Sequence, residues 1–115
     1  MNSSLWHGKQ KITYRKSISK NDSFDVAIIG AGFSGLWSAF HLKQFQPNLK
    51  IAIFEKEYVG FGASGRNGGW ASAEYPTSSN RLIKENGLES YKNLRAAITK
   101  SIDEIGEIAK SNNWQ

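Results

Sequence analysis

Three glycines and one acidic residue have the types and spacing needed to bind a nucleotide. Gly30, Gly32 and Gly35 fit the pattern G-x-G-x-x-G, and Glu55 follows twenty residues after the last of them. Such glycines allow a tight turn, a close approach of the backbone to a pyrophosphate and close helix packing. N–H groups at a helix start stabilise phosphate charge, and a carboxylate binds ribose hydroxyls. The pattern predicts a site for a dinucleotide that carries no 2′-phosphate.

The segments around this motif supply the context that the pattern needs. A short apolar run over 24–29 predicts a buried strand, helical spacing of apolar residues covers 33–45, and a second strand is expected over 49–54. Two strands joined by such a helix form a parallel βαβ unit with a right-handed crossover. The alternative is a βαβ unit whose glycines serve packing alone. The fingerprint does not separate FAD from NAD.

A second glycine-rich segment begins five residues after Glu55. Five glycines fall within residues 60–69, interleaved with Ser64, Arg66 and Asn67. Such a segment can offer backbone N–H groups, a hydroxyl and a guanidinium to bound phosphates. The alternative is a mobile surface loop.

The rest of the chain predicts helices. A short helical turn is expected over 80–86, and Gly87 separates it from a long amphipathic helix over 88–111. We therefore expect an α/β fold, with a Rossmann-like βαβ unit followed by a glycine-rich loop and a long helix. Two strands do not complete a doubly wound sheet, so the FAD/NAD(P)-binding domain is expected to be incomplete.

Three stretches together resemble a known family. "DVAIIGAGFSGLWSAFHL", "IAIFEKE" and "GFGASGRNGGW" are similar to the N-terminus of FAD-dependent oxidoreductases of the D-amino acid oxidase, glycine oxidase and sarcosine oxidase type. The likeness covers about residues 24–113 and extends to γ-glutamylputrescine oxidase-like members. The Leu5-Trp6 pair before the first strand also fits.

The resemblance implies an extended FAD and assigns residues to its parts. The pyrophosphate would be approached by Gly30, Gly32 and Gly35, with the helix start at Phe33 and Ser34. The adenosine ribose would be bound by Glu55, with Lys56 beside it, and the pyrophosphate and ribityl region would be contacted by Ala63, Ser64 and Arg66. Toward the isoalloxazine would run Asn67, Gly68 and Gly69. Some relatives link the flavin to a histidine in this second loop. The histidines of this chain, His7 and His41, lie elsewhere, so such a link is not expected.

The chemistry implied is oxidation of an amine or amino acid by hydride transfer to flavin. This chain would be part of a longer enzyme, with its catalytic residues and substrate site outside the segment. Arg66 could clamp a substrate, but its place in the loop favours a cofactor role. His41 is expected to be a packing or surface residue. No metal site is expected.

We expect a basic N-terminal arm over 1–22 and a truncated FAD-binding domain over 23–115. Alone, this piece should expose apolar surface that further chain would cover. It is therefore expected to bind FAD weakly or not at all by itself, and to be inactive.

The net charge of +5 belongs to the arm. Residues 1–20 hold five of the fifteen basic residues and no acid, so the remainder is neutral. The arm could be a solvated extension that docks Leu5 and Trp6, a targeting peptide, or a tether to nucleic acid or lipid. The neutral body argues against nucleic acid as a partner. No apolar run is long enough to span a membrane, and the absence of cysteine fits a reducing, cytoplasmic location.

Two other functions stay open from sequence. One is a segment of an NAD-dependent dehydrogenase with the same fingerprint, against which the second glycine loop argues. The other is a nucleotide-binding module tethered by the basic arm.

Overall fold

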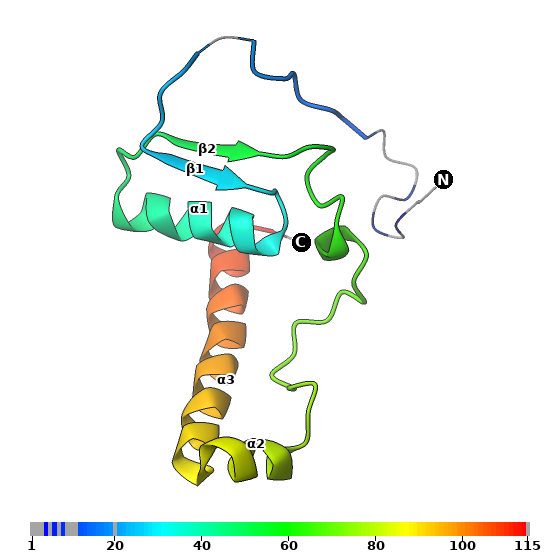
Figure 1. The fold of residues 1–115 in the computed structure, drawn as a ribbon, viewed down its shortest axis with the longest axis vertical. Coiled ribbons are helices and arrows are strands. Elements are labelled where there is room, and N and C mark those ends of the chain that lie inside the picture. Colours follow the sequence, from blue (N-terminus) through cyan, green and yellow to red (C-terminus); the bar gives the residue numbers. More distant parts are fainter. Residues whose placement is uncertain (1–3, 5, 7, 9–11, 20, 115) are drawn as a thin grey trace. The chain divides into compact units, whose positions relative to one another are not determined.

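The computed structural model describes residues 4, 6, 8, 12–19 and 21–114. The element order is β1 (Val26–Ile29), α1 (Phe33–Phe45), β2 (Ile51–Phe54), the 3₁₀ helix η2 (Ala63–Gly65), α2 (Ser79–Asn86) and α3 (Leu88–Ser111) (Figure 1). The chain divides into two compact units, residues 1–68 and 69–115. It is an α/β chain, as expected.

The first unit is built on a parallel pair of strands. β1 pairs with β2 in a register that places Val26 beside Ile51 and Ile29 beside Phe54. Helix α1 joins the strands and packs along one side of them, while residues 12–19 pass on the other side in this view (Figure 1). Since parallel strands require such a crossover, the expected β–α–β order and the helix over 33–45 are confirmed.

The expectation that the first strand is buried is wrong. Val26 and Ile28 are half-buried, whereas Ile29 is 84% exposed. Among the described residues only Ala31, just after β1, is fully buried. The reason is that one helix covers one face of two strands, so each side chain is enclosed on one side only. Phe45 at the end of α1 is likewise 82% exposed.

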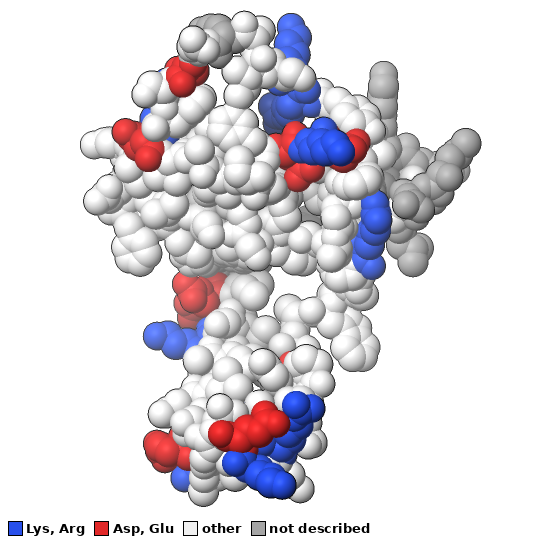
Figure 2. Space-filling model, viewed as in Figure 1, with Lys and Arg blue, Asp and Glu red and all other residues white. Residues whose placement is uncertain are grey.

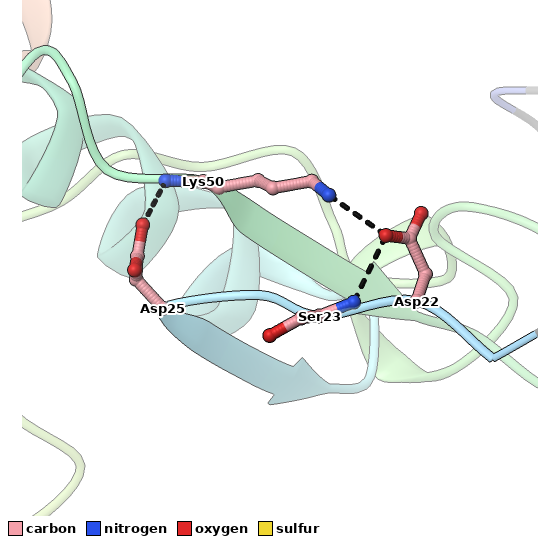
Figure 3. Close-up of polar contacts among 4 residues, drawn as sticks. All are labelled: Asp22, Ser23, Asp25 and Lys50. Atoms are coloured by element: carbon pink, nitrogen blue, oxygen red, sulfur yellow. Dashed lines mark hydrogen bonds and ion pairs between the residues drawn. The ribbon is translucent and has the colours of Figure 1, made fainter.

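A polar clasp of Asp22, Asp25 and Lys50 holds together the chain segments that enter the two strands (Figure 3). Asp25 Oδ2 accepts a hydrogen bond from the Lys50 backbone N–H at 2.7 Å. The Lys50 ammonium lies 2.8 Å from Asp22 Oδ1 and sits over the Phe24 ring. The same Asp22 oxygen accepts from the Ser23 N–H. These bonds lower the pKa of Asp22, chiefly through Lys50.

The second unit is a pair of helices. The Ser78 hydroxyl caps α2 by accepting from the Arg81 N–H at 3.3 Å, and Gly87, with φ of +84°, separates α2 from α3. Ser79 and Tyr91 join the two helices through their hydroxyls, 2.8 Å apart. Both helices match the ranges expected from the sequence to within one residue. Within the described residues, no helix has the length and apolar character needed to cross a membrane.

Candidate cofactor-binding site

The first glycine loop (residues 30–35) turns the chain from β1 into α1. Gly30 has φ of +96°, a conformation that favours glycine, and its N–H bonds the Phe54 carbonyl at 2.7 Å. A Cβ on Gly35 would lie 2.1 Å from the Gly30 carbonyl oxygen and 3.3 Å from the Ile28 side chain. Only glycine therefore lets α1 begin this close to the end of β1, as the motif predicts.

Glu55 fixes this loop from the end of β2. Its Oε2 accepts a hydrogen bond from the Ala31 N–H at 2.8 Å, and its Oε1 accepts from the Glu57 N–H at 3.1 Å. These bonds, first of all that from Ala31, hold the pKa of Glu55 below its ordinary value. A carboxylate has about four acceptor positions, so the group can hold the loop and still accept from ribose hydroxyls.

The second glycine loop (residues 60–69) meets the first at the start of α1. Ser64 Oγ accepts a hydrogen bond from the Phe33 N–H at 2.9 Å, and the Gly60 N–H donates to the Ala31 carbonyl at 3.0 Å. A Cβ on Gly32 would lie 2.9 Å from Ser64 Oγ. The two loops thus form one continuous structure, and Ser64 supplies the cap that Gly32, without a side chain, cannot give.

The electrostatics of this junction suit an anion. The first turn of α1 contains no acidic residue, so its N–H groups and dipole present partial positive charge. Arg66 follows η2, and its guanidinium lies over the Phe61 ring at 4.7 Å. A pyrophosphate fits these features: a first helical turn free of carboxylates, small residues that let the backbone approach, and a guanidinium on the loop that bonds to the helix start.

The structure brings most of the expected site residues together in the first unit. Ala63 and Ser64 lie in η2, the Arg66 N–H bonds the Ala63 carbonyl, and the Asn67 amide bonds the Ser64 carbonyl. Lys56 follows Glu55 and is exposed. Gly69, with φ of +74°, belongs to the second unit, so it is not placed against the others.

Two features around the loops were not assigned from sequence. Ala31 anchors Glu55, and aromatic side chains at Tyr58 and Phe61 support the second loop. The glycine pattern does not specify these aromatic contacts, because they depend on how the loop places the two rings and on Tyr14, which lies 44 residues before Tyr58. His41 stacks on Trp37 within α1, as a packing residue would. Leu5 and His7 lie outside the described residues.

Comparison with known proteins identifies the family. The family model described as FAD dependent oxidoreductase (DAO) matches residues 25–111. The chain is 30% identical over 94 residues to γ-glutamylputrescine oxidoreductase of Escherichia coli (strain K12), covering 82% of this chain and 22% of that protein. It is 39% identical over 83 residues to the probable oxidoreductase OrdL of Haemophilus influenzae, covering 72% and 19%.

A third relative is coproporphyrinogen III oxidase of Staphylococcus aureus, 40% identical over 81 residues, which covers 70% of this chain and 15% of that protein. The chain thus spans about a fifth of the length of these curated relatives. No solved structure shows significant similarity to it. With the family model matching most of the chain, the sequence resemblance is confirmed: this chain belongs to the FAD-dependent oxidoreductase (DAO) family, and FAD is the cofactor of that family.

Proposed function

We propose that residues 23–115 form the N-terminal part of a Rossmann-like FAD-binding domain, preceded by a basic arm over 1–22. The observation that carries this proposal is the junction of the two glycine loops at the start of α1, through Ser64 and Gly60. A carboxylate-free helix start beside a guanidinium-bearing loop suits the pyrophosphate that FAD carries. The relatives, each several times longer than the aligned segment, support a partial domain.

Each part of the site would hold one part of FAD. Gly30, Gly32 and Gly35, with Phe33 and Ser34, would let the pyrophosphate approach the helix start. Glu55 would orient the adenosine ribose, with Lys56 beside it. Ala63, Ser64 and Arg66 would contact the pyrophosphate and ribityl chain, and Asn67, Gly68 and Gly69 would lead toward the flavin ring. Bound FAD would supply the electron acceptor, which takes a hydride from the carbon next to a substrate amine.

We further propose an amine or amino acid as the substrate of the whole enzyme. The support is the similarity to γ-glutamylputrescine oxidoreductase, whose name states an amine substrate. Coproporphyrinogen III oxidase shares a comparable stretch, so this segment serves cofactor binding rather than substrate choice. We assign no catalytic residue in this chain. Arg66 is proposed as a cofactor contact rather than a substrate clamp, because it follows η2 and stacks on Phe61.

The two other functions have less support. Family membership favours FAD over NAD as the cofactor. The body of the chain gives little support to nucleic-acid binding, because residues 21–115 are neutral and acidic side chains lie beside basic ones on the face shown in Figure 2. The absence of a nucleic-acid partner and the cytoplasmic location stay predictions.

Residues 1–115 alone are expected to bind FAD weakly and to be inactive, because apolar side chains such as Ile29, Phe33 and Phe45 stay exposed. A tight, stoichiometric yellow complex of purified 1–115 would contradict this. For the full-length protein, we expect bound FAD whose absorbance bleaches when an amine or amino acid is added without oxygen. Bleaching by 2-hydroxy acids but by no amine would contradict the proposed substrate class.

A further inference from the structure

The N-terminal arm bonds directly to the second glycine loop. The Trp6 indole Nε1–H donates to the Asn67 carbonyl at 2.8 Å. The Ser4 hydroxyl donates to the Gly65 carbonyl, and the Trp6 N–H donates to the Ser4 hydroxyl oxygen. Trp6 is 57% exposed, so burial alone does not hold it in place. Both loop carbonyls face the arm.

An aromatic ladder forms a second connection between arm and loop. Tyr14 of the arm meets the Tyr58 ring edge-on, with centroids 5.8 Å apart. Tyr58 in turn meets Phe61 at 5.2 Å, and Phe61 supports the Arg66 guanidinium at 4.7 Å. Aromatic pairs prefer such edge-to-face geometry, and cations are attracted to ring faces. The ladder therefore runs from the arm to the guanidinium proposed to contact FAD.

The bond from Trp6 also fixes the orientation of a peptide group. In a trans peptide the C=O and the following N–H point in opposite directions. No peptide among the described residues is cis. With the Asn67 carbonyl bound to the indole, the Gly68 N–H must point away from the arm. That N–H belongs to the stretch proposed to lead toward the flavin ring.

We propose that the N-terminal arm positions the second glycine loop for FAD, with Trp6 acting through the Asn67 carbonyl and Tyr14 acting through the ladder on Arg66. Glycine-rich segments lose much conformational freedom when they become ordered. Anchoring the loop before FAD arrives removes part of this cost from the binding step. Trp6 and Tyr14 are positioning residues that need not touch FAD. The inference rests on the proposed function, because it takes the second loop to be part of the FAD site.

The test compares Trp6 variants in the full-length protein. Trp6→Phe keeps an aromatic ring but removes the N–H donor. Trp6→His keeps a five-membered ring whose Nε2 occupies the position of the indole Nε1, so it can still donate. Trp114→Phe makes the same chemical change as Trp6→Phe at a residue that follows α3, and it serves as the matched control.

The measurements are the FAD dissociation constant of each apoprotein, the visible spectrum of bound flavin, and the thermal midpoint of each apoprotein. Trp6→Phe is expected to raise the dissociation constant about five- to tenfold, as for one lost hydrogen bond, and to shift the flavin spectrum. Trp6→His should bring the FAD dissociation constant and the flavin spectrum most of the way back to the wild type. Trp114→Phe should leave the dissociation constant and the spectrum unchanged. A purely structural role for Trp6 would lower the midpoint without altering the spectrum.

Two results would overturn the inference while FAD still binds the wild type. One is an unchanged FAD affinity and spectrum in Trp6→Phe. The other is an equal loss in Trp6→Phe and Trp6→His, which would show that the N–H donor is irrelevant. A full-length wild type that binds no FAD would refute the proposed function and the inference together, so the two failures are distinguishable.

Discussion

The hydroxyl oxygen of Ser64 accepts a hydrogen bond from the backbone N–H of Phe33, at 2.9 Å, although the two residues lie 31 positions apart. This bond joins the second glycine loop to the first helical residue of α1. It also places a neutral acceptor, rather than a carboxylate, at the positive end of the helix. A pyrophosphate entering this junction would meet a first helical turn that carries no acidic side chain of its own.

Ser64→Ala should weaken both the fold and FAD binding. Removing a hydroxyl that caps a helix costs about 1 kcal/mol, and the Phe33 N–H would lose its partner. Chemical denaturation of the full-length apoprotein measures the first effect, and titration with FAD measures the second. Ser38→Ala, at an exposed position of the same helix, is the matched control. Equal behaviour of the two variants would contradict a role for the Ser64 cap.

Gly32→Ala should destabilise the loop junction by about 1–3 kcal/mol, the usual cost of overpacking. Its Cβ would lie 2.9 Å from Ser64 Oγ, closer than a normal contact. Because that oxygen causes the clash, adding Ser64→Ala should recover part of the lost stability. Gly62→Ala is the control, since a Cβ there meets nothing within 4 Å. Denaturation of the wild type, the two single variants at Gly32 and Ser64 and the double variant gives the coupling energy. If the two single effects on the free energy of unfolding simply add in the double variant, the contact is contradicted.

Acid should weaken the protein through Glu55. Hydrogen bonds from Ala31 and Glu57 hold the pKa of this carboxyl below 4.5 in the folded state. A lowered folded pKa means that the stabilisation is present above the unfolded pKa and is lost as pH falls through the folded value. The thermal unfolding midpoint of the wild type should therefore fall as the pH drops below about 4.5. Glu55→Gln should show a smaller fall. A Glu55→Gln protein whose midpoint falls with pH as steeply as that of the wild type would contradict the assignment.

The clasp at the strand starts should affect stability without affecting the cofactor. Asp22 and Lys50 lie where the chain enters the strands (Figure 3), whereas the glycine loops follow the strand ends. We expect Asp22→Asn to lower the thermal midpoint slightly, by an amount that shrinks at high salt, because the pair is exposed. FAD affinity should stay at the wild-type value. A marked loss of FAD affinity in Asp22→Asn would show that the two ends of the strands are coupled.

Local patterns predicted most of the elements. The glycine fingerprint located α1 at Phe33, and Gly87 located the break before α3, because each depends on nearby backbone geometry. Burial was not predictable in the same way. The apolar run that includes Ile29 indicates a strand covered on both faces, yet coverage depends on elements beyond the local sequence.

The contacts that shape the site were also beyond local patterns. Ser64 and Arg66 were expected near phosphates from the resemblance, but the bond of Ser64 to Phe33 joins segments far apart in sequence. One of the three interpretations of the arm had Leu5 and Trp6 dock on the body as apolar residues. The Trp6 indole N–H instead bonds a loop carbonyl, a directional contact that composition does not specify.

The most direct test of a pyrophosphate site at the loop junction compares FAD with riboflavin, which lacks the pyrophosphate and the adenosine. Binding of each to the full-length apoprotein is measured for the wild type and for Arg66→Gln. The wild type should bind FAD on the order of a hundredfold more tightly than riboflavin, as for two charge-assisted hydrogen bonds. Arg66→Gln should narrow this ratio, because it should weaken the binding of FAD by a larger factor than the binding of riboflavin. Equal affinity for the two flavins, or equal weakening of both by Arg66→Gln, would contradict the site.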